Sequence, residues 1–169
     1  ENPMNKTVAA AAVAGMMAGS GAQAAGPEDT LVMELRTGTV IIEMRPDLAP
    51  NHVARIKELT RQGFYDGLVF HRVIEGFMAQ TGDPRGDGTG GSGQNIDAEF
   101  TNTPFERGTV GMARSQNPNS GDSQFYIMFE RSPHLDGQYT VWGQVTEGMD
   151  HVDRIKKGIS AMNGVVQNP

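Results

Sequence analysis

Cysteine is absent from the 169-residue sequence, and only 20% of the residues carry a charge. Without thiols the chain has no disulfide framework, no cysteine nucleophile and no cysteine-ligated zinc site. The chain also lacks an excess of basic residues, because 14 Lys and Arg face 20 Asp and Glu, a formal net charge of −6. No basic stripe is available to neutralise phosphates, so we expect neither a nucleic-acid partner nor an anionic membrane partner.

Long hydrophobic runs are also missing. The apolar stretch Val8–Ala18 has 11 residues, whereas a membrane-spanning helix needs about 20. A positive charge at Lys6 precedes this stretch, and Ala22-Gln23-Ala24 follows it with the small-x-small form that signal peptidase cuts. We therefore predict that residues 1–24 are an export leader cleaved after Ala24, which sends the protein to the periplasm or outside the cell. A disordered, low-complexity tail is the alternative interpretation.

Residues 25–169 are then expected to form one domain, and residues 1–3, which precede Met4, are interpreted as an extension. A chain of about 145 residues buries roughly 68–70% of its unfolded surface in a single core. The 22 glycines and 9 prolines indicate many turns between short strands.

Hydrophobic periodicity predicts mainly β-structure. Alternation over 31–45 predicts a hairpin that turns at Thr37-Gly38, and the spacing of Val53, Ile56 and Leu59 predicts a helix over 50–62. Further short strands are predicted at 68–73, 77–81, 109–113, 124–129 and 140–145, with a second helix from about 149 that ends at Gly158. Some seven strands with two helices favour a closed β-barrel or a sandwich.

Several short motifs suggest other chemistry, but their context is wrong. Gly86–Gly91 fits the dinucleotide fingerprint G-x-G-x-x-G, yet no helical pattern follows it. A calcium-binding loop could begin at Asp83, but Arg85 stands at its third position, where an oxygen ligand is required. A structural glycine-rich loop is the better interpretation. Gly121-Asp122-Ser123 is similar to a serine-protease nucleophile segment with His71 as its base, but no glycines follow to shape an oxyanion hole.

Metal binding also has little support in the sequence. The four histidines show no i,i+4 pairing and no carboxylate at metal-ligand spacing, so we expect no metal site. They are His52, His71, His134 and His151.

A series of blocks closely resembles the cyclophilin-type peptidyl-prolyl isomerases, in matching order over about residues 30–158. The blocks are Phe70-His71-Arg72-Val73-Ile74, Gly76-Phe77-Met78, Gln80, Gly82-Asp83, Gly88–Gly91, Met112-Ala113-Arg114, Ser123–Ile127 and Leu135–Gly143. The resemblance implies an eight-stranded antiparallel barrel, closed, with one helix over each open end and an active groove on the outer face. It also implies isomerisation of X-Pro bonds during protein folding, a reaction that makes no covalent bond and needs no cofactor.

The same resemblance assigns the site residues. Arg72 takes the catalytic position, since a guanidinium is permanently charged and can donate a hydrogen bond to the prolyl nitrogen as the amide twists. Gln80 takes the position that hydrogen-bonds the substrate backbone. The proline pocket and the groove beside it are assigned to Phe77, Met78, Tyr126, His134, Leu135 and Tyr139, and to Ala113, Arg114 and Gln124.

Three departures from the family pattern limit this assignment. His134 stands where many eukaryotic members have a Trp that contacts cyclosporin, so we expect weak binding of that drug. Tyr126 and Tyr139 replace a frequent Phe and a frequent His, keeping an aromatic body with a different polar tip. Relatives continue after an Asn-Pro such as Asn168-Pro169 with a last strand that closes the barrel, so the expected domain is short by one strand and has an exposed edge.

Two other functional classes remain as alternatives. A non-catalytic module could bind proline peptides through the same groove, although such a module would be free to lose Arg72. A small hydrolase that uses Ser123 would lack an oxyanion loop. The expected protein is a monomer that acts on proline-containing unfolded or loop segments of other proteins.

Overall fold

The computed structural model describes residues 26–169, so the predicted leader lies outside the described residues. Seven strands and two helices are present, as the periodicity predicts. They are β1 (Thr30–Leu35), β2 (Gly38–Met44), α1 (Pro50–Arg61), β3 (Arg72–Ile74), β4 (Met78–Thr81), β5 (Thr109–Met112), β6 (Phe125–Met128), β7 (Val141–Glu147) and α2 (Met149–Asp153), with single 3₁₀ turns at Pro27–Asp29, Pro133–Leu135 and Ser160–Met162.

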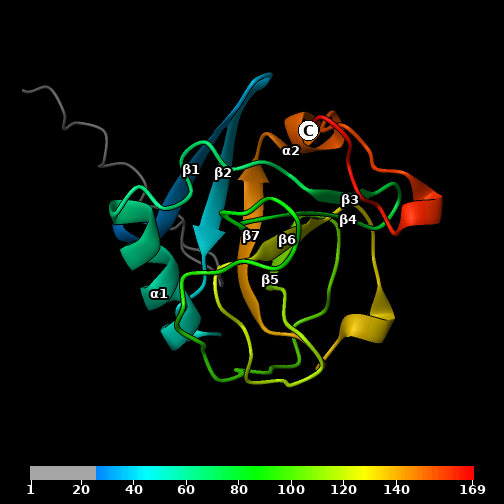
Figure 1. Cartoon of the computed structure of the whole chain (residues 1–169). Coiled ribbons are helices and arrows are strands. Elements are labelled where there is room, and N and C mark those ends of the chain that lie inside the picture. Colours follow the sequence, from blue (N-terminus) through cyan, green and yellow to red (C-terminus); the bar gives the residue numbers. More distant parts are fainter. Residues whose placement is uncertain (1–25) are drawn as a thin grey trace, which may run out of the picture.

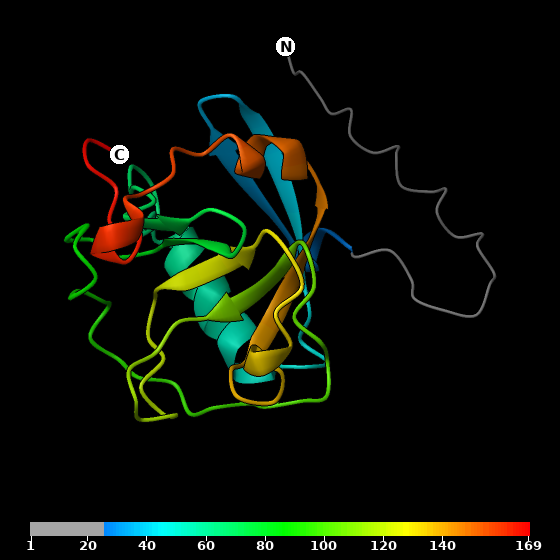
Figure 2. The ribbon, with the colours of Figure 1, turned by 90° about the vertical axis from the view of Figure 1, so that its right-hand side faces the viewer.

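All strands belong to one antiparallel sheet in the order β1-β2-β7-β5-β6-β4-β3. The sheet curls around a core, as the two views in Figures 1 and 2 show. The ladder has seven strands and ends at β1 and β3, so the structure is a curled half-barrel and does not confirm the closed eight-stranded barrel.

Alternation of side chains along the strands gives the sheet two buried faces. Along β6, Phe125 and Ile127 belong to the inner core, whereas Tyr126 and Met128 belong to a second cluster on the outer face. Successive residues of a strand point to opposite faces, so a short run of four apolar residues serves both clusters at once. Both clusters matter for function, because the outer one carries the candidate site.

The two helices cover different parts of the sheet. Proline at its first position starts α1, which buries Val53, Ile56 and Leu59 as the spacing predicts. The shorter α2 adds Val152 to the same inner core and lies above the sheet in both ribbon views (Figures 1 and 2). Within residues 26–169 no helix has the length and apolar character needed to cross a bilayer.

Three local predictions need correction. The hairpin turns at Arg36-Thr37, because Leu35 pairs with Gly38. The third strand begins at Arg72 rather than 68. The second helix ends at Asp153 and not near Gly158, because the Lys157 ammonium caps the Asp153 carbonyl and the Gly158 N–H donates to β3 instead.

The C-terminal segment lies along the outer edge of β3. The Val73 N–H donates to the Gly164 carbonyl at 2.8 Å, the Gly158 N–H donates to the Val73 carbonyl at 2.8 Å, and the Val166 N–H donates to the His71 carbonyl at 3.1 Å. These bonds satisfy the backbone of a strand that has only three residues. The segment after α2 therefore becomes part of the wall beside the candidate site.

Candidate active site

A row of side chains crosses the outer face of the sheet. Arg72 of β3 pairs with Gln80 of β4, Gln80 pairs with Tyr126 of β6, and Tyr126 pairs with Gly111 of β5. Residues that are directly opposite in neighbouring strands point to the same face. Since Gly111 has no side chain, the Phe105 and Tyr126 rings occupy the space above it, stacked with centroids 6.0 Å apart.

The row borders a cavity of about 490 Å³. Its floor is apolar, since Met78, Tyr126 and Leu135 are nearly inaccessible and Phe77 is half-buried beside them. The cavity brings together all but one of the site residues assigned from the sequence. It is lined by Arg72, Phe77, Met78, Gln80, Ala113, Arg114, Tyr126, His134, Leu135, Gln138 and Tyr139.

Neutral acceptors hold the Arg72 guanidinium on two sides. Nη1 donates to Gln80 Oε1 at 3.1 Å, Nε donates to the Asn163 carbonyl at 3.1 Å, and Nη2 donates to Asn163 Oδ1 at 3.2 Å. Among residues 26–169 no carboxylate forms an ion pair with this group. Burial lowers the pKa of Arg72 from its usual value, and the Tyr139 hydroxyl raises it. The guanidinium is therefore oriented while its charge stays unneutralised.

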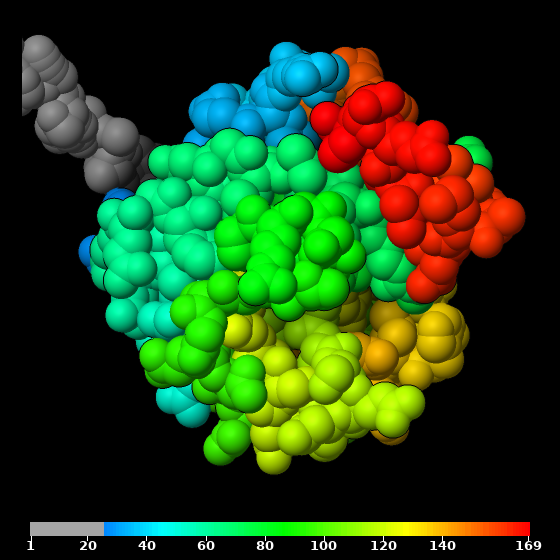
Figure 3. All heavy atoms as spheres, in the orientation of Figure 1, coloured from blue at the N-terminus to red at the C-terminus, as the bar shows by residue number. Residues whose placement is uncertain are grey.

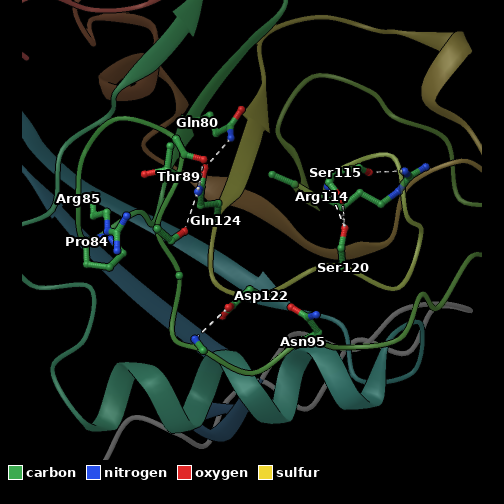
Figure 4. Close-up of a pocket in the computed structure, with 15 residues that line it drawn as sticks. Gln80, Pro84, Arg85, Thr89, Asn95, Arg114, Ser115, Ser120, Asp122 and Gln124 are labelled. Carbon is green, nitrogen blue, oxygen red and sulfur yellow. Dashed lines mark hydrogen bonds between the residues drawn. The ribbon is translucent and has the colours of Figure 1, made fainter.

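A chain of amides connects Arg72 to the glycine-rich loop. Gln80 Nε2 donates to Gln124 Oε1 at 2.9 Å, and Gln124 Nε2 donates to the Gly90 carbonyl at 2.9 Å and the Gly88 carbonyl at 3.1 Å. Figure 4 shows Gln80 and Gln124 in line with this loop. Each amide presents its oxygen toward Arg72 and its nitrogen toward the loop, so the loop fixes the orientation of both glutamines.

The glycine-rich loop is itself organised around a buried carboxylate. Asp83 is 1% exposed, and it accepts the backbone N–H groups of Arg85, Asp87 and Gly88. Burial alone would raise the pKa of Asp83. The backbone N–H donors lower it by more than burial raises it, so the pKa lies below its usual value. The loop is thus held by a charge, and no helix follows it to receive a pyrophosphate.

A second cavity of about 560 Å³ adjoins the first, because Gln80, Ala113 and Arg114 line both. It contains Gln124, the remaining assigned residue, and lies between the glycine-rich loop and the loop around Ser115 and Ser120. Figure 3 shows this region as a hollow between the green loop and the yellow-green loop. Together the two cavities make an elongated groove.

The wall opposite Arg72 is aromatic. The Arg114 guanidinium lies 4.3 Å from the centroid of the Tyr139 ring and donates to the Gln138 carbonyl at 2.6 Å. Tyr139 in turn meets Tyr126 edge-on at 6.1 Å. His134 is exposed at the rim and packs against Phe77, with ring centroids 5.8 Å apart.

The residues considered for other chemistries lie in structural positions. Ser123 is fully buried and its hydroxyl donates to the Gly82 carbonyl at 2.7 Å, so it is not presented to a substrate. His71 is buried, burial lowers its pKa, and neither ring nitrogen has a hydrogen-bond partner. In the described part of the chain no group of three metal-ligating residues comes together.

The sequence does not predict two residues of the site, Gln138 and Asn163. Gln138 lies within the last block, but the resemblance assigns it no role. Asn163 contacts Arg72 from 91 positions away. Its only sequence signal is the Asn163-Gly164 pair, which is typical of a tight turn.

Comparison with known proteins agrees with this geometry. Residues 30–169 match the family model "Cyclophilin type peptidyl-prolyl cis-trans isomerase/CLD". A probable peptidyl-prolyl cis-trans isomerase of Brucella suis biovar 1 is 59% identical over 160 residues, covering 88% of this chain and 82% of the relative. Peptidyl-prolyl cis-trans isomerase B of Bacillus subtilis is 45% identical over 118 residues, covering 69% of this chain and 82% of the relative.

Solved structures show the same fold. Cyclophilin AquaCyp293 from Hirschia baltica superposes with a TM-score of 0.72 and 31% identity, covering 78% of this chain and 69% of that chain. A Cryptosporidium parvum cyclophilin-type isomerase, determined in the presence of the dipeptide Ala-Pro, gives a TM-score of 0.72 at 26% identity, covering 83% of this chain and 99% of that one.

The chain therefore belongs to the cyclophilin-type peptidyl-prolyl cis-trans isomerases. Its reaction is the cis-trans isomerisation of the peptide bond that precedes proline.

The anchoring of the glycine-rich loop leads to a test of stability. Asp83→Asn replaces an acceptor of several N–H groups with an amide whose NH₂ faces them, and should lower the free energy of unfolding by about 1–3 kcal/mol. The pKa of Asp83 is depressed in the folded state, so its stabilisation is present above the unfolded pKa of about 4 and is lost as the pH falls through the folded pKa. Urea unfolding, followed by fluorescence of the buried Trp142, should show the deficit at pH 7 and a smaller one at pH 3.

A matched control is Asp97→Asn, which changes an exposed carboxylate that no described hydrogen bond or ion pair uses. The control should unfold with the parent. An Asp83→Asn variant as stable as the parent at pH 7 would contradict the anchoring role.

Proposed function

We propose that Arg72 is the catalytic residue of this isomerase and that the cavity beside it seats the proline ring. The observation that carries this proposal is a guanidinium held by three hydrogen bonds to neutral acceptors at the rim of an apolar cavity. A guanidinium has five N–H donors. Two therefore remain, one on each Nη atom, for a substrate.

The chemistry needed is stabilisation of a twisted amide. The barrier for an X-Pro bond is about 18–20 kcal/mol, because rotation breaks amide resonance. In the twisted state the nitrogen lone pair is localised and becomes a hydrogen-bond acceptor, which it is not in the planar ground state. A donor that is fixed beforehand and carries full positive charge stabilises the twisted state selectively.

The apolar cavity supplies the second requirement, a fixed ring. Phe77, Met78 and Leu135 offer hydrophobic contact to a pyrrolidine, while Gln80 stands ready to bind the peptide backbone next to it. With the ring held, thermal motion of the flanking peptide becomes rotation about the prolyl bond. Backbone contacts in the adjoining cavity at Ala113 and Gln124 give generality over many sequences. Suitable substrates are thus proline-containing unfolded segments and loops.

The role of Arg72 is tested by Arg72→Lys. An ammonium keeps the charge but not the planar donor geometry, so kcat/KM should fall at least 100-fold, which corresponds to about 2.7 kcal/mol of transition-state stabilisation. A proline tetrapeptide assay measures this, and the melting temperature checks the fold. Arg61→Lys, an exposed change on α1, should keep the parent activity. Activity of Arg72→Lys within about threefold of the parent would refute the assigned role.

Export is proposed from the leader. Lys6, the apolar stretch and Ala22-Gln23-Ala24 support cleavage after Ala24 and action in the periplasm or outside the cell, where newly exported chains fold. We expect a mature N-terminus at Ala25 when the protein is produced in a bacterial host. Mass spectrometry after cell fractionation decides this, and a cytoplasmic product that keeps Met4 contradicts it.

Weak cyclosporin binding is proposed from His134. This exposed imidazole packs at a tilt against Phe77 at the rim, where a Trp would offer a larger apolar face and one fixed N–H donor. His134→Trp should therefore tighten cyclosporin binding about tenfold or more, which corresponds to ~1–3 kcal/mol of binding free energy. Isomerase efficiency, which depends on Arg72 and the apolar floor, should change only a few-fold. Inhibition constants are measured for both proteins, and equal constants would show that His134 does not limit drug binding.

A closed barrel is also proposed on the basis of the family resemblance. An eighth strand would pair with β1 of the first hairpin and close the gap toward β3, whose outer edge the C-terminal segment already covers; β1 and β3 are the two ends of the ladder. Support comes from a cavity of about 500 Å³ near those strands, which apolar side chains of Leu35, Phe70 and Val166 help to line. A monomer is expected for the protein with its barrel closed, since closure removes the free edges.

A further inference from the structure

We infer that Asn163 is a positioning residue of the isomerase, which sets the orientation of the Arg72 guanidinium. The inference rests on the proposed catalytic role of Arg72. Asn163 supplies two of the three acceptors that hold this group: its carbonyl accepts from Nε at 3.1 Å and its Oδ1 accepts from Nη2 at 3.2 Å. Asn163 thus accepts both hydrogen bonds from the Nε–Nη2 edge of the guanidinium, and Gln80 accepts one from Nη1.

The backbone at Asn163 explains how one residue provides both acceptors. Asn163 has φ 55° and Gly164 has φ 83°, so two consecutive residues adopt the left-handed conformation of a tight turn. Asparagine tolerates this conformation better than most residues with a side chain. The turn directs the carbonyl and the side chain of the same residue toward Arg72.

The position of this turn is fixed from both sides. The Gly164 carbonyl accepts the Val73 N–H, which follows Arg72 directly. Ile159 bridges to Val165 across the base of the turn. A side chain at Gly164 would collide with Ile74 and the Val73 backbone, so the turn is packed against β3 as closely as it can be. The acceptors of Asn163 therefore have a fixed place relative to the strand that carries Arg72.

The chemistry of the amide also suits the task. A carboxylate at this position would orient the guanidinium more strongly but would neutralise the charge that the twisted prolyl nitrogen requires. An amide oxygen orients the group without that cost. With three donors occupied, the plane of the guanidinium is fixed relative to the cavity that Arg72 lines, and so are the directions of its two remaining Nη donors. Loss of one acceptor should allow the group to rotate out of this orientation while its charge remains.

The test is Asn163→Gly, which permits the same left-handed turn and removes the side chain, and with it the Oδ1 acceptor of Arg72 Nη2. We expect kcat to fall roughly tenfold, as for a modest misplacement of a catalytic group, while KM stays within about twofold because the apolar floor is intact. Asn168→Gly is a matched control, since Asn168 also has φ 55° in the same segment and only its backbone carbonyl is hydrogen-bonded. The control should have parent kcat and KM.

Two further measurements separate positioning from general weakening of the fold. Nitrogen-15 spectra should show restricted rotation of the Arg72 Nη2 group in the parent and in Asn168→Gly, and faster rotation in Asn163→Gly. In the Arg72→Lys background, Asn163→Gly should cause no further loss of kcat beyond about twofold, because the group that it positions is gone.

The outcomes distinguish the two proposals. If Arg72→Lys is inactive while Asn163→Gly has parent kcat, only the role of Asn163 is overturned. If Asn163→Gly lowers kcat by the same factor with Arg or Lys at position 72, Asn163 acts independently of Arg72 and the inference is also overturned. If Arg72→Lys is fully active, the catalytic role of Arg72 fails, whatever Asn163→Gly does.

Discussion

The register between β3, β4 and β6 is the constraint on which the site depends. It places Arg72, Gln80 and Tyr126 side by side on the outer face, while Val73, Ala79 and Ile127 enter the core from the opposite face. A slip of one residue would exchange the two sets completely. The core therefore enforces the geometry of the site, because burying an arginine and a glutamine in its place would be prohibitive.

Charge is distributed unevenly between the site and its support. Within residues 26–169 the Arg72 guanidinium hydrogen-bonds only to two side-chain amide oxygens and one backbone carbonyl, so no carboxylate neutralises its charge. The carboxylate of Asp83 does not contact Arg72 but accepts hydrogen bonds from backbone N–H groups of the glycine-rich loop. The loop then orients Gln124 and Gln80. Charge-assisted hydrogen bonds thus hold the glycine-rich loop, whereas hydrogen bonds to neutral acceptors hold Arg72.

Much of this arrangement can be predicted from sequence, because short-range periodicity determines which residues enter the core. Alternation predicts the β1–β2 hairpin, turn residues on either side delimit the other five strands, and the spacing of Val53, Ile56 and Leu59 predicts α1. The family motif predicts the residues of the cavity, but it carries no signal for contacts that depend on distant backbone. The early end of α2 and the contact between Asn163 and Arg72 both involve the C-terminal segment, which packs along β3.

That packing also has a consequence for the order in which the protein forms. Of the two residues that hold the guanidinium, Asn163 is 91 positions from Arg72 in the chain, whereas Gln80 is only 8 positions from it. Contacts between distant positions form late, because a long loop must close before they contribute. During synthesis the strands that build the cavity emerge from the ribosome well before the turn at Asn163. On the proposed function, the residues that seat the proline ring therefore emerge before the residue that orients Arg72.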